Sequence, residues 1–66
     1  MTRGELYRME TEELIEAIQE ADTWYEDTID MLKELAERVG IDPDEYTEID
    51  KLAEAVQKAV GTDIGA

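Results

Sequence analysis

The 66-residue chain is predicted to be all-α, a single helical domain built as an antiparallel helical hairpin that forms a dimeric helical bundle. Three observations predict this fold. Apolar residues recur at steps of three and four from residue 11 to residue 39, which is the spacing of one helix face. A glycine, an acidic N-cap residue and a proline then follow within a few positions. A second stripe of the same period continues to residue 60.

Residues 1–10 are predicted to form a short N-terminal arm. Thr2 and Glu5 have the spacing of a capping box, which begins a helical turn. Leu6 and Met9 are out of phase with the apolar stripe that follows, so we expect the first helical turn to end near residues 9–11.

The longest predicted element is one uninterrupted helix over residues 11–39. Neither Gly nor Pro occurs in it, and much of it is Glu, Leu, Ala and Lys, which favour helix. Its residues, about 28, would extend about 40 Å at a rise of about 1.5 Å per residue. The stripe is three heptad positions wide, which is typical of packing in a globular bundle. It contains Leu14, Ile15, Ile18, Ala21, Tyr25, Thr28, Ile29, Leu32, Leu35, Ala36 and Val39.

The residues after this helix predict that it ends and that a second helix begins within a few residues. Gly40 is expected in the left-handed conformation that ends many helices, with Ile41 at the apolar position after it. Asp42 is a favourable N-cap and Pro43 a favourable first helical residue. Such a short connection favours antiparallel neighbours.

The second helix is predicted over residues 43–60. Thr47 offers a second cap, so the first turn is expected to be offset or of the 3-10 type. Gly61 is expected to end the helix, and residues 62–66 to form a loose tail.

The two predicted helices differ in length, so the shorter one covers only part of the longer one. The apolar residues near the start of the long helix then need cover from the N-terminal arm or from a second subunit. A two-fold homodimer is the simplest closure. Trp24, at the edge of the stripe, is expected either to close the core or to anchor an interface. The predicted interface residues are Leu14, Ile15, Ile18, Trp24 and Met31.

Charge is the most informative part of the composition. The chain has 19 acidic and 6 basic residues, a net charge of −13, and neither cysteine nor histidine. Such a chain repels nucleic acid and anionic membranes and attracts basic surfaces. We expect no cofactor and no bound metal. The sequence lacks a long apolar run and an apolar leader, which favours a cytoplasmic protein.

Acidic residues occupy the outer heptad positions of the long helix, and no base occurs in residues 9–32. An ordinary helix surface mixes the two signs and gains from pairs four residues apart. Here only Glu34 with Arg38 and Glu54 with Lys58 are well oriented for such pairs. The predicted partner-binding residues are Glu12, Glu13, Glu16, Glu20, Glu26, Asp27, Asp30 and Glu34.

This acidic face favours a non-enzymatic interaction protein that occupies a basic groove of a partner, as a nucleic-acid mimic does. By analogy of size and charge, its most concrete form is a small viral inhibitor of the phage anti-defence type, such as an anti-CRISPR protein. An alternative is a structural oligomerisation module of a salt-adapted cell, in which the acids form only a solvated face.

A second pattern favours an enzyme. Glu12-Glu13-x-x-Glu16 followed by Asp27-x-x-Asp30 resembles the paired-carboxylate motif of the MazG-like nucleotide pyrophosphohydrolases. The resemblance implies Mg²⁺ held by acids on two neighbouring helices. On one straight helix the two clusters would lie about 20 Å apart. A metal site would therefore require a bend that turns the acids toward a common point.

Overall fold

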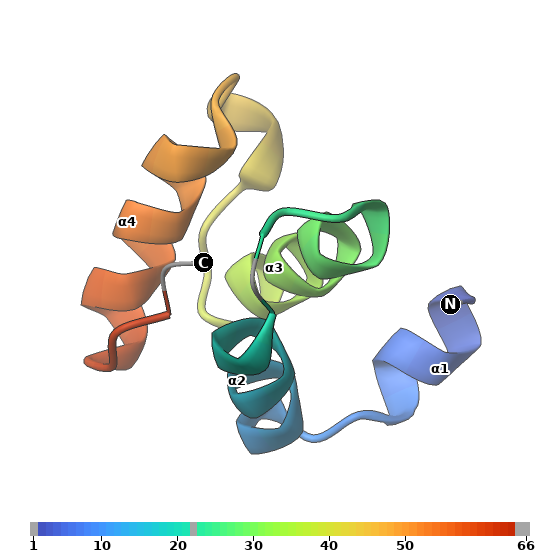
Figure 1. Cartoon of the computed structure of the whole chain (residues 1–66). Helices are drawn as coiled ribbons and strands as arrows, with labels where there is room; N and C mark the ends of the chain where they lie inside the picture. The colour runs from blue at the N-terminus through green and yellow to red at the C-terminus, as the bar shows by residue number, and fades with distance from the viewer. Residues whose placement is uncertain (1, 22, 65–66) are drawn as a thin grey trace.

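The computed structural model describes residues 2–21 and 23–64, and every regular element within them is helical. The helices pack around α3, which contacts each of the other helical elements (Figure 1). The largest dimension of the Cα trace is 24 Å. The elements are α1 (Arg3–Arg8), α2 (Thr11–Glu20), α3 (Glu26–Arg38), the 3-10 helix η1 (Pro43–Glu45) and α4 (Ile49–Val60).

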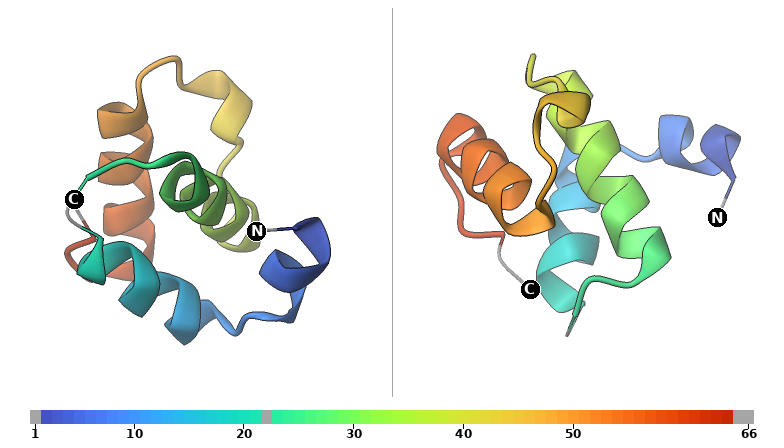
Figure 2. Two further views of the ribbon diagram at one scale, coloured as in Figure 1. Left: turned by 45° about the vertical axis from the view of Figure 1, so that its right-hand side comes forward. Right: turned by 90° about the horizontal axis from the view of Figure 1, so that it is seen from above.

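The predicted uninterrupted helix over residues 11–39 is wrong, because the chain bends between α2 and α3. An uninterrupted helix of this length would extend about 40 Å. The whole Cα trace extends only 24 Å, and α2 and α3 pack against each other instead of lying end to end (Figure 2).

The bend lies where the sequence supports a helix least. Residues 23–25 are Thr, Trp and Tyr, each less favourable than Ala in a helix interior by about half a kcal/mol. Ala21 and Tyr25 have extended backbone, and the Tyr25 N–H donates to the Thr23 carbonyl at 3.1 Å. Acidic residues then fill the first turn of α3, where carboxylates stabilise a helix N-terminus. Ending a helix here therefore costs little.

The bend buries apolar side chains that a straight helix would leave in water. Leu14 and Ile18 of α2 are fully buried, as are Leu32 and Leu35 of α3. Complete burial of one such side chain contributes about 1.5–3 kcal/mol. The apolar face of α2 is thus buried against α3 of the same chain. The hairpin prediction had expected the N-terminal arm or a second subunit to bury it.

Tyr25 shows how the bend changes the register of the apolar stripe. Its predicted core position is wrong: the residue is 63 % exposed, because it is the N-cap of α3 and not part of a continuous helix. Met31, outside the predicted stripe, is only 7 % exposed and belongs to the core. Thr28, inside the predicted stripe, is buried as expected.

The predicted helix end at Gly40 is confirmed. Gly40 has φ of +82°, in the left-handed region. The Ile41 N–H donates to the Ala36 carbonyl at 2.8 Å, and the Gly40 N–H donates to the Glu37 carbonyl at 3.3 Å. These two hydrogen bonds define a Schellman motif, and they satisfy carbonyls that the helix itself leaves unpaired.

The second helix is shorter than predicted. Asp42 is the expected cap, since its Oδ1 accepts a hydrogen bond from a backbone N–H two residues on, at 3.0 Å. Only the 3-10 helix η1 follows, and α4 begins at Ile49, so the predicted span of 43–60 is wrong at its start. The offset first turn is present, but the N-cap of α4 is Glu48 and not Thr47.

The N-terminal arm forms the predicted helical turn, α1. The Thr2 Oγ1 accepts a hydrogen bond from the Glu5 N–H at 3.3 Å, and the break falls at Met9, which has extended backbone. Leu6 is buried in the core, and α1 contacts α3.

The loose tail predicted over residues 62–66 is wrong for its described part. The chain turns back after α4, so that Ile64 is fully buried. The Gln19 Nε2 of α2 donates to the Asp63 carbonyl at 2.8 Å, which joins the end of the chain to α2. Residues 65–66 lie outside the described residues.

The architecture is therefore a cluster of helices around α3 and not a two-helix hairpin with an arm. α4 packs against α3, as the hairpin required, but α2 and α1 also contact α3. The homodimer stays a prediction. In the described part of the chain, no helix combines the length and the apolar character needed to cross a membrane.

Leu14→Ala is expected to lower the free energy of unfolding by about 2–4 kcal/mol, because it leaves a cavity between α2 and α3. Denaturant unfolding followed by circular dichroism measures this loss. Tyr25→Ala is the control: an uninterrupted helix would bury Tyr25, but here we expect a change within about 0.5 kcal/mol. Equal losses for the two variants would contradict the bend.

Gly40→Ala is expected to lower the free energy of unfolding by about 1 kcal/mol. An added Cβ meets no heavy atom within 4 Å, so the loss would come from the positive φ alone. Gly4→Ala is the matched control, because Gly4 lies inside α1 and its Cβ would meet only Thr2 Oγ1, at 3.9 Å. That variant is expected to stabilise the protein by up to about 1 kcal/mol. Thermal unfolding of both variants tests the opposite signs, and a neutral Gly40→Ala would argue against the Schellman end.

Candidate functional site

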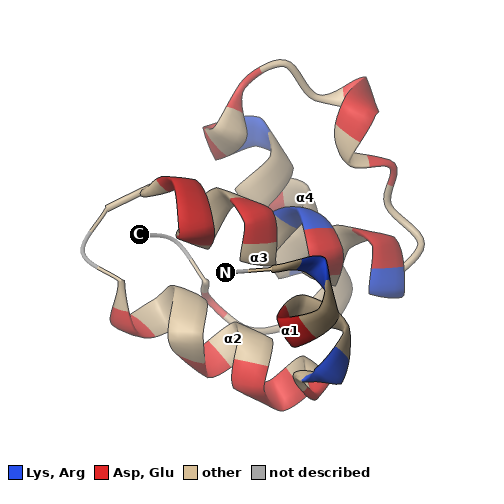
Figure 3. Ribbon diagram, turned by 90° about the vertical axis from the view of Figure 1, so that its right-hand side faces the viewer, with Lys and Arg blue, Asp and Glu red and all other residues tan. Residues whose placement is uncertain are grey.

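Acidic side chains cover much of the protein surface. Within residues 2–21 and 23–64, every Asp and Glu is exposed except Asp30 and Glu34, which are half-buried. Acidic residues lie on α2, on α3 and around η1, with few basic residues between them (Figure 3). A surface of one sign produces a potential that attracts basic proteins.

The bend divides the predicted acidic face between two helices. Four of its residues are exposed on α2, and two more are exposed in the first turn of α3. The predicted straight rod of carboxylates is thus replaced by two shorter acidic faces on helices that pack against each other. We call these six residues the α2/α3 acidic surface: Glu12, Glu13, Glu16, Glu20, Glu26 and Asp27.

Asp30 and Glu34 lie outside this exposed surface. The Glu34 Oε2 accepts a hydrogen bond from the Arg38 Nε at 3.0 Å, and only 12 % of the Glu34 side chain is exposed. This pair has the predicted spacing of four residues. The other predicted pair, Glu54 with Lys58, does not form an ion pair, although both residues are described.

Arg38 also joins α1 to α3. Its Nη2 donates to the Leu6 carbonyl at 2.9 Å. Leu6 lies near the end of α1, where its carbonyl also accepts a hydrogen bond from the Met9 N–H at 3.2 Å and where a cation is favourable. The Arg38 side chain is 20 % exposed, so the interaction is partly shielded from water.

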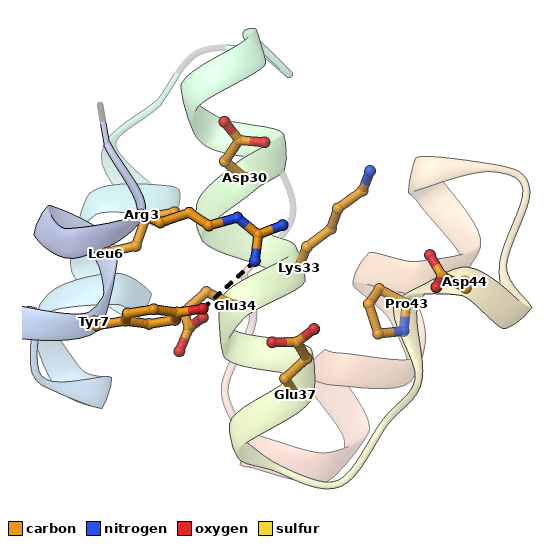
Figure 4. Close-up of a pocket in the computed structure, with 9 residues that line it drawn as sticks. All are labelled: Arg3, Leu6, Tyr7, Asp30, Lys33, Glu34, Glu37, Pro43 and Asp44. Carbon is orange, nitrogen blue, oxygen red and sulfur yellow. Dashed lines mark hydrogen bonds between the residues drawn. The ribbon is translucent and has the colours of Figure 1, made fainter.

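A hollow of about 290 Å³ opens between α1, α3 and η1 (Figure 4). Leu6 and Pro43, both buried, contribute its apolar part. The Arg3 Nη1 donates to the Tyr7 hydroxyl at 3.4 Å, and this hydrogen bond raises the pKa of the Arg3 guanidinium. Arginine is already charged at neutral pH, so its charge does not change. The charged side chains that line the hollow are Arg3, Asp30, Lys33, Glu34, Glu37 and Asp44.

This hollow was not foreseen from the sequence. Arg3, Tyr7 and Lys33 belong to helices that are far apart along the chain, and no local pattern indicates that these helices meet. The charges around the hollow have both signs, so it lacks the single polarity of the α2/α3 acidic surface.

Among the described residues, the bend does not bring together the metal ligands that the MazG-like resemblance implied. The bend lies between the two acidic clusters, where that site would need one. Yet no group of three or more potential ligands within the described residues is arranged to hold a metal ion. Glu13 and Glu16 on α2 therefore do not converge with Asp27 and Asp30 of α3 into such a group, and the geometry adds no support for a hydrolase.

Most of the predicted interface residues pack in the core of the single chain. Leu14 and Ile18 are fully buried and Met31 is nearly so. Ile15 and Trp24 are half-buried and pack against the same core. A second copy of this fold can therefore reach only part of the predicted interface.

Comparisons of the chain with protein-family models, with curated proteins and with solved structures found no match.

Arg38→Met is expected to release α1 from α3, because methionine keeps much of the apolar stem but donates no hydrogen bond. Amide hydrogen exchange in α1 should accelerate, and the free energy of unfolding should fall by about 1–2 kcal/mol. Nuclear magnetic resonance measures the exchange residue by residue. Arg8→Met is the control, because it removes the same charge from an exposed position in α1. Similar acceleration in both variants would contradict the role of the Leu6 contact.

Proposed function

We propose that this protein is a non-enzymatic interaction protein that binds a basic surface of a partner protein. The observation that carries the proposal is the α2/α3 acidic surface: six exposed carboxylates on two helices that pack together. The segment that holds them, residues 9–32, contains no base to neutralise them. A basic partner would be attracted to this excess of negative charge.

The helical backbone supports this proposal because it fixes the spacing of the charges. On α2 the carboxylates of Glu12, Glu16 and Glu20 follow one another at about 6 Å along the helix axis. Residues held on a packed helix lose less conformational entropy on binding than residues of a flexible acidic segment. An ordered array also distinguishes one basic surface from another, since a mismatch leaves like charges together.

The most concrete form of this function is mimicry of a nucleic acid. The protein would occupy a groove that otherwise binds DNA or RNA, as expected of a viral inhibitor of a cytoplasmic defence protein. The bend sets the size of the mimic, because a 24 Å body spans roughly seven base pairs at about 3.4 Å each. The predicted straight rod would have spanned roughly twelve.

One observation favours the alternative of a structural module from a salt-adapted cell. Nearly all described acids are exposed, not only those on α2 and α3. A solvated acidic coat would place them in the same way. Circular dichroism in rising salt separates the two functions: an inhibitor should fold at ordinary ionic strength, whereas a salt-adapted module should need molar salt.

The protein is expected to displace fluorescent duplex DNA from a sequence-nonspecific DNA-binding protein, with an affinity that falls steeply as salt rises. Glu12→Gln combined with Glu16→Gln should weaken displacement about 2- to 30-fold, because each of the two exposed ion pairs contributes about 0.2–1 kcal/mol. Fluorescence anisotropy measures the bound DNA.

The matched control combines Glu45→Gln with Glu54→Gln, which removes two exposed charges outside the α2/α3 acidic surface. This variant should displace the duplex almost as well as the wild type. Equal weakening by both double variants would show that net charge alone acts. Failure of the wild type to displace DNA at low salt would reject the mimic.

A further inference from the structure

The outer faces of α2 and α4 carry one residue pattern with opposite charges at its ends. Residues 13–20 read ELIEAIQE and residues 51–58 read KLAEAVQK, identical at four of eight positions. The buried positions correspond as well, since the pairs Leu14 and Leu52, and Ile18 and Val56, are all in the core. Two helices that bury the same face of one pattern also present the same face outward.

Three positions of the pattern form a line along each outer face, because residues four and seven apart share one side of a helix. The outer two positions are exposed and charged, and the middle one is a half-buried alanine. The charges lie about 10.5 Å apart along the axis. The line on α2 is Glu13, Ala17 and Glu20, and the line on α4 is Lys51, Ala55 and Lys58.

The line on α4 borders a hollow of about 460 Å³. Ile41 and Tyr46, both half-buried, contribute apolar surface to it. Lys51 and Lys58 form no ion pair with any described residue. Glu54 also lines this hollow, so two lysines and one glutamate give its lining a net charge of +1. On a protein of net charge −13, two unpaired lysines beside apolar surface suit a ligand that is both acidic and partly apolar.

We propose that this face of α4 binds α2 of a second copy of the chain. In an antiparallel pairing, Glu13 of one copy meets Lys58 of the other and Glu20 meets Lys51. The two alanines then lie opposite each other at the centre, where small side chains let the helices approach closely. Charge complementarity selects this occupant, because α2 presents two acids at the spacing of the two lysines.

Three features limit the affinity. Each copy carries a net charge of −13, so the copies repel each other at long range. Glu16 and Glu54, exposed at equivalent positions, add like charges beside the contact. One helix pair also buries less than the standard interface of about 1,600 Å². The association should therefore be weak, with a Kd between about 10 μM and 1 mM.

This contact does not depend on the proposed function, and it differs from the predicted interface, whose Leu14 and Ile18 are buried. It does share Glu13 and Glu20 with the α2/α3 acidic surface. A basic partner would therefore compete with self-association for these two carboxylates.

A charge swap tests the contact by sedimentation velocity at about 0.15 M ionic strength, where the Debye length is about 8 Å. The wild type should exceed the mass of the 7.5 kDa monomer as its concentration approaches about 1 mM. The double variants Lys51→Glu with Lys58→Glu and Glu13→Lys with Glu20→Lys should each remain monomeric. An equimolar mixture of the two should associate again, because every contact then joins opposite charges.

The second double variant separates a specific contact from a general charge effect. It changes the net charge by four, from −13 to −9, so relief of repulsion alone would make it associate more strongly than the wild type. Lys33→Glu, on α3, adds negative charge away from the contact and should leave self-association almost unchanged.

Circular dichroism checks that each variant folds. If the lysine swap does not fold, Lys51→Gln with Lys58→Gln takes its place as the variant expected to remain monomeric. A monomeric wild type at about 1 mM would overturn the proposal, as would a mixture of folded variants that stays monomeric. Displacement of DNA by the wild type does not depend on these outcomes, so the proposed function can stand or fall separately.

Discussion

The burial of Leu14 and Ile18 against α3 is the constraint on which the rest of the structure depends. A chain of 66 residues without cysteine has to bury most of its large apolar side chains in one core. An uninterrupted helix would place the start of α2 beyond the reach of that core. The bend costs a few helical hydrogen bonds among residues that favour helix weakly. It gains two fully buried side chains, at about 1.5–3 kcal/mol each.

Once α2 and α3 are packed together, the short elements complete the core from other directions. α1 adds Leu6, and the end of the chain adds Ile64, which is fully buried. Each of these segments is also tied to a longer helix by one side-chain hydrogen bond to a backbone carbonyl. Arg38 holds α1 at the Leu6 carbonyl, and Gln19 holds the chain end at the Asp63 carbonyl. In this way segments too short to be stable alone gain order from the helices they contact.

Because the core takes up most of the large apolar side chains, binding of a partner depends mainly on surface charge. Among the described residues, Tyr7 and Tyr25 are the only exposed large hydrophobic side chains. A surface of that kind recognises a partner mainly by electrostatic complementarity, which controls specificity and the rate of encounter more than affinity. The proposed function rests on the acids of α2 and α3, and the proposed self-association pairs two acids of α2 with the two exposed lysines of α4.

The sequence by itself determined what depends on neighbouring residues: the helical class, the cap at Asp42, the stop at Gly40 and the exposure of most predicted acids. It could not place the bend, because the heptad phase that runs through Ile18 continues unbroken to Leu32, and only weak helix formers marked the interruption. Tertiary structure alone decided that α2 folds back on α3, that the acidic face is divided, and that Arg38 also reaches the Leu6 carbonyl of α1. The physical reason is that helix periodicity shows which face of a helix is buried. It does not show which other helix packs against that face, because the packing depends on the free energy of burying apolar surface in the whole core.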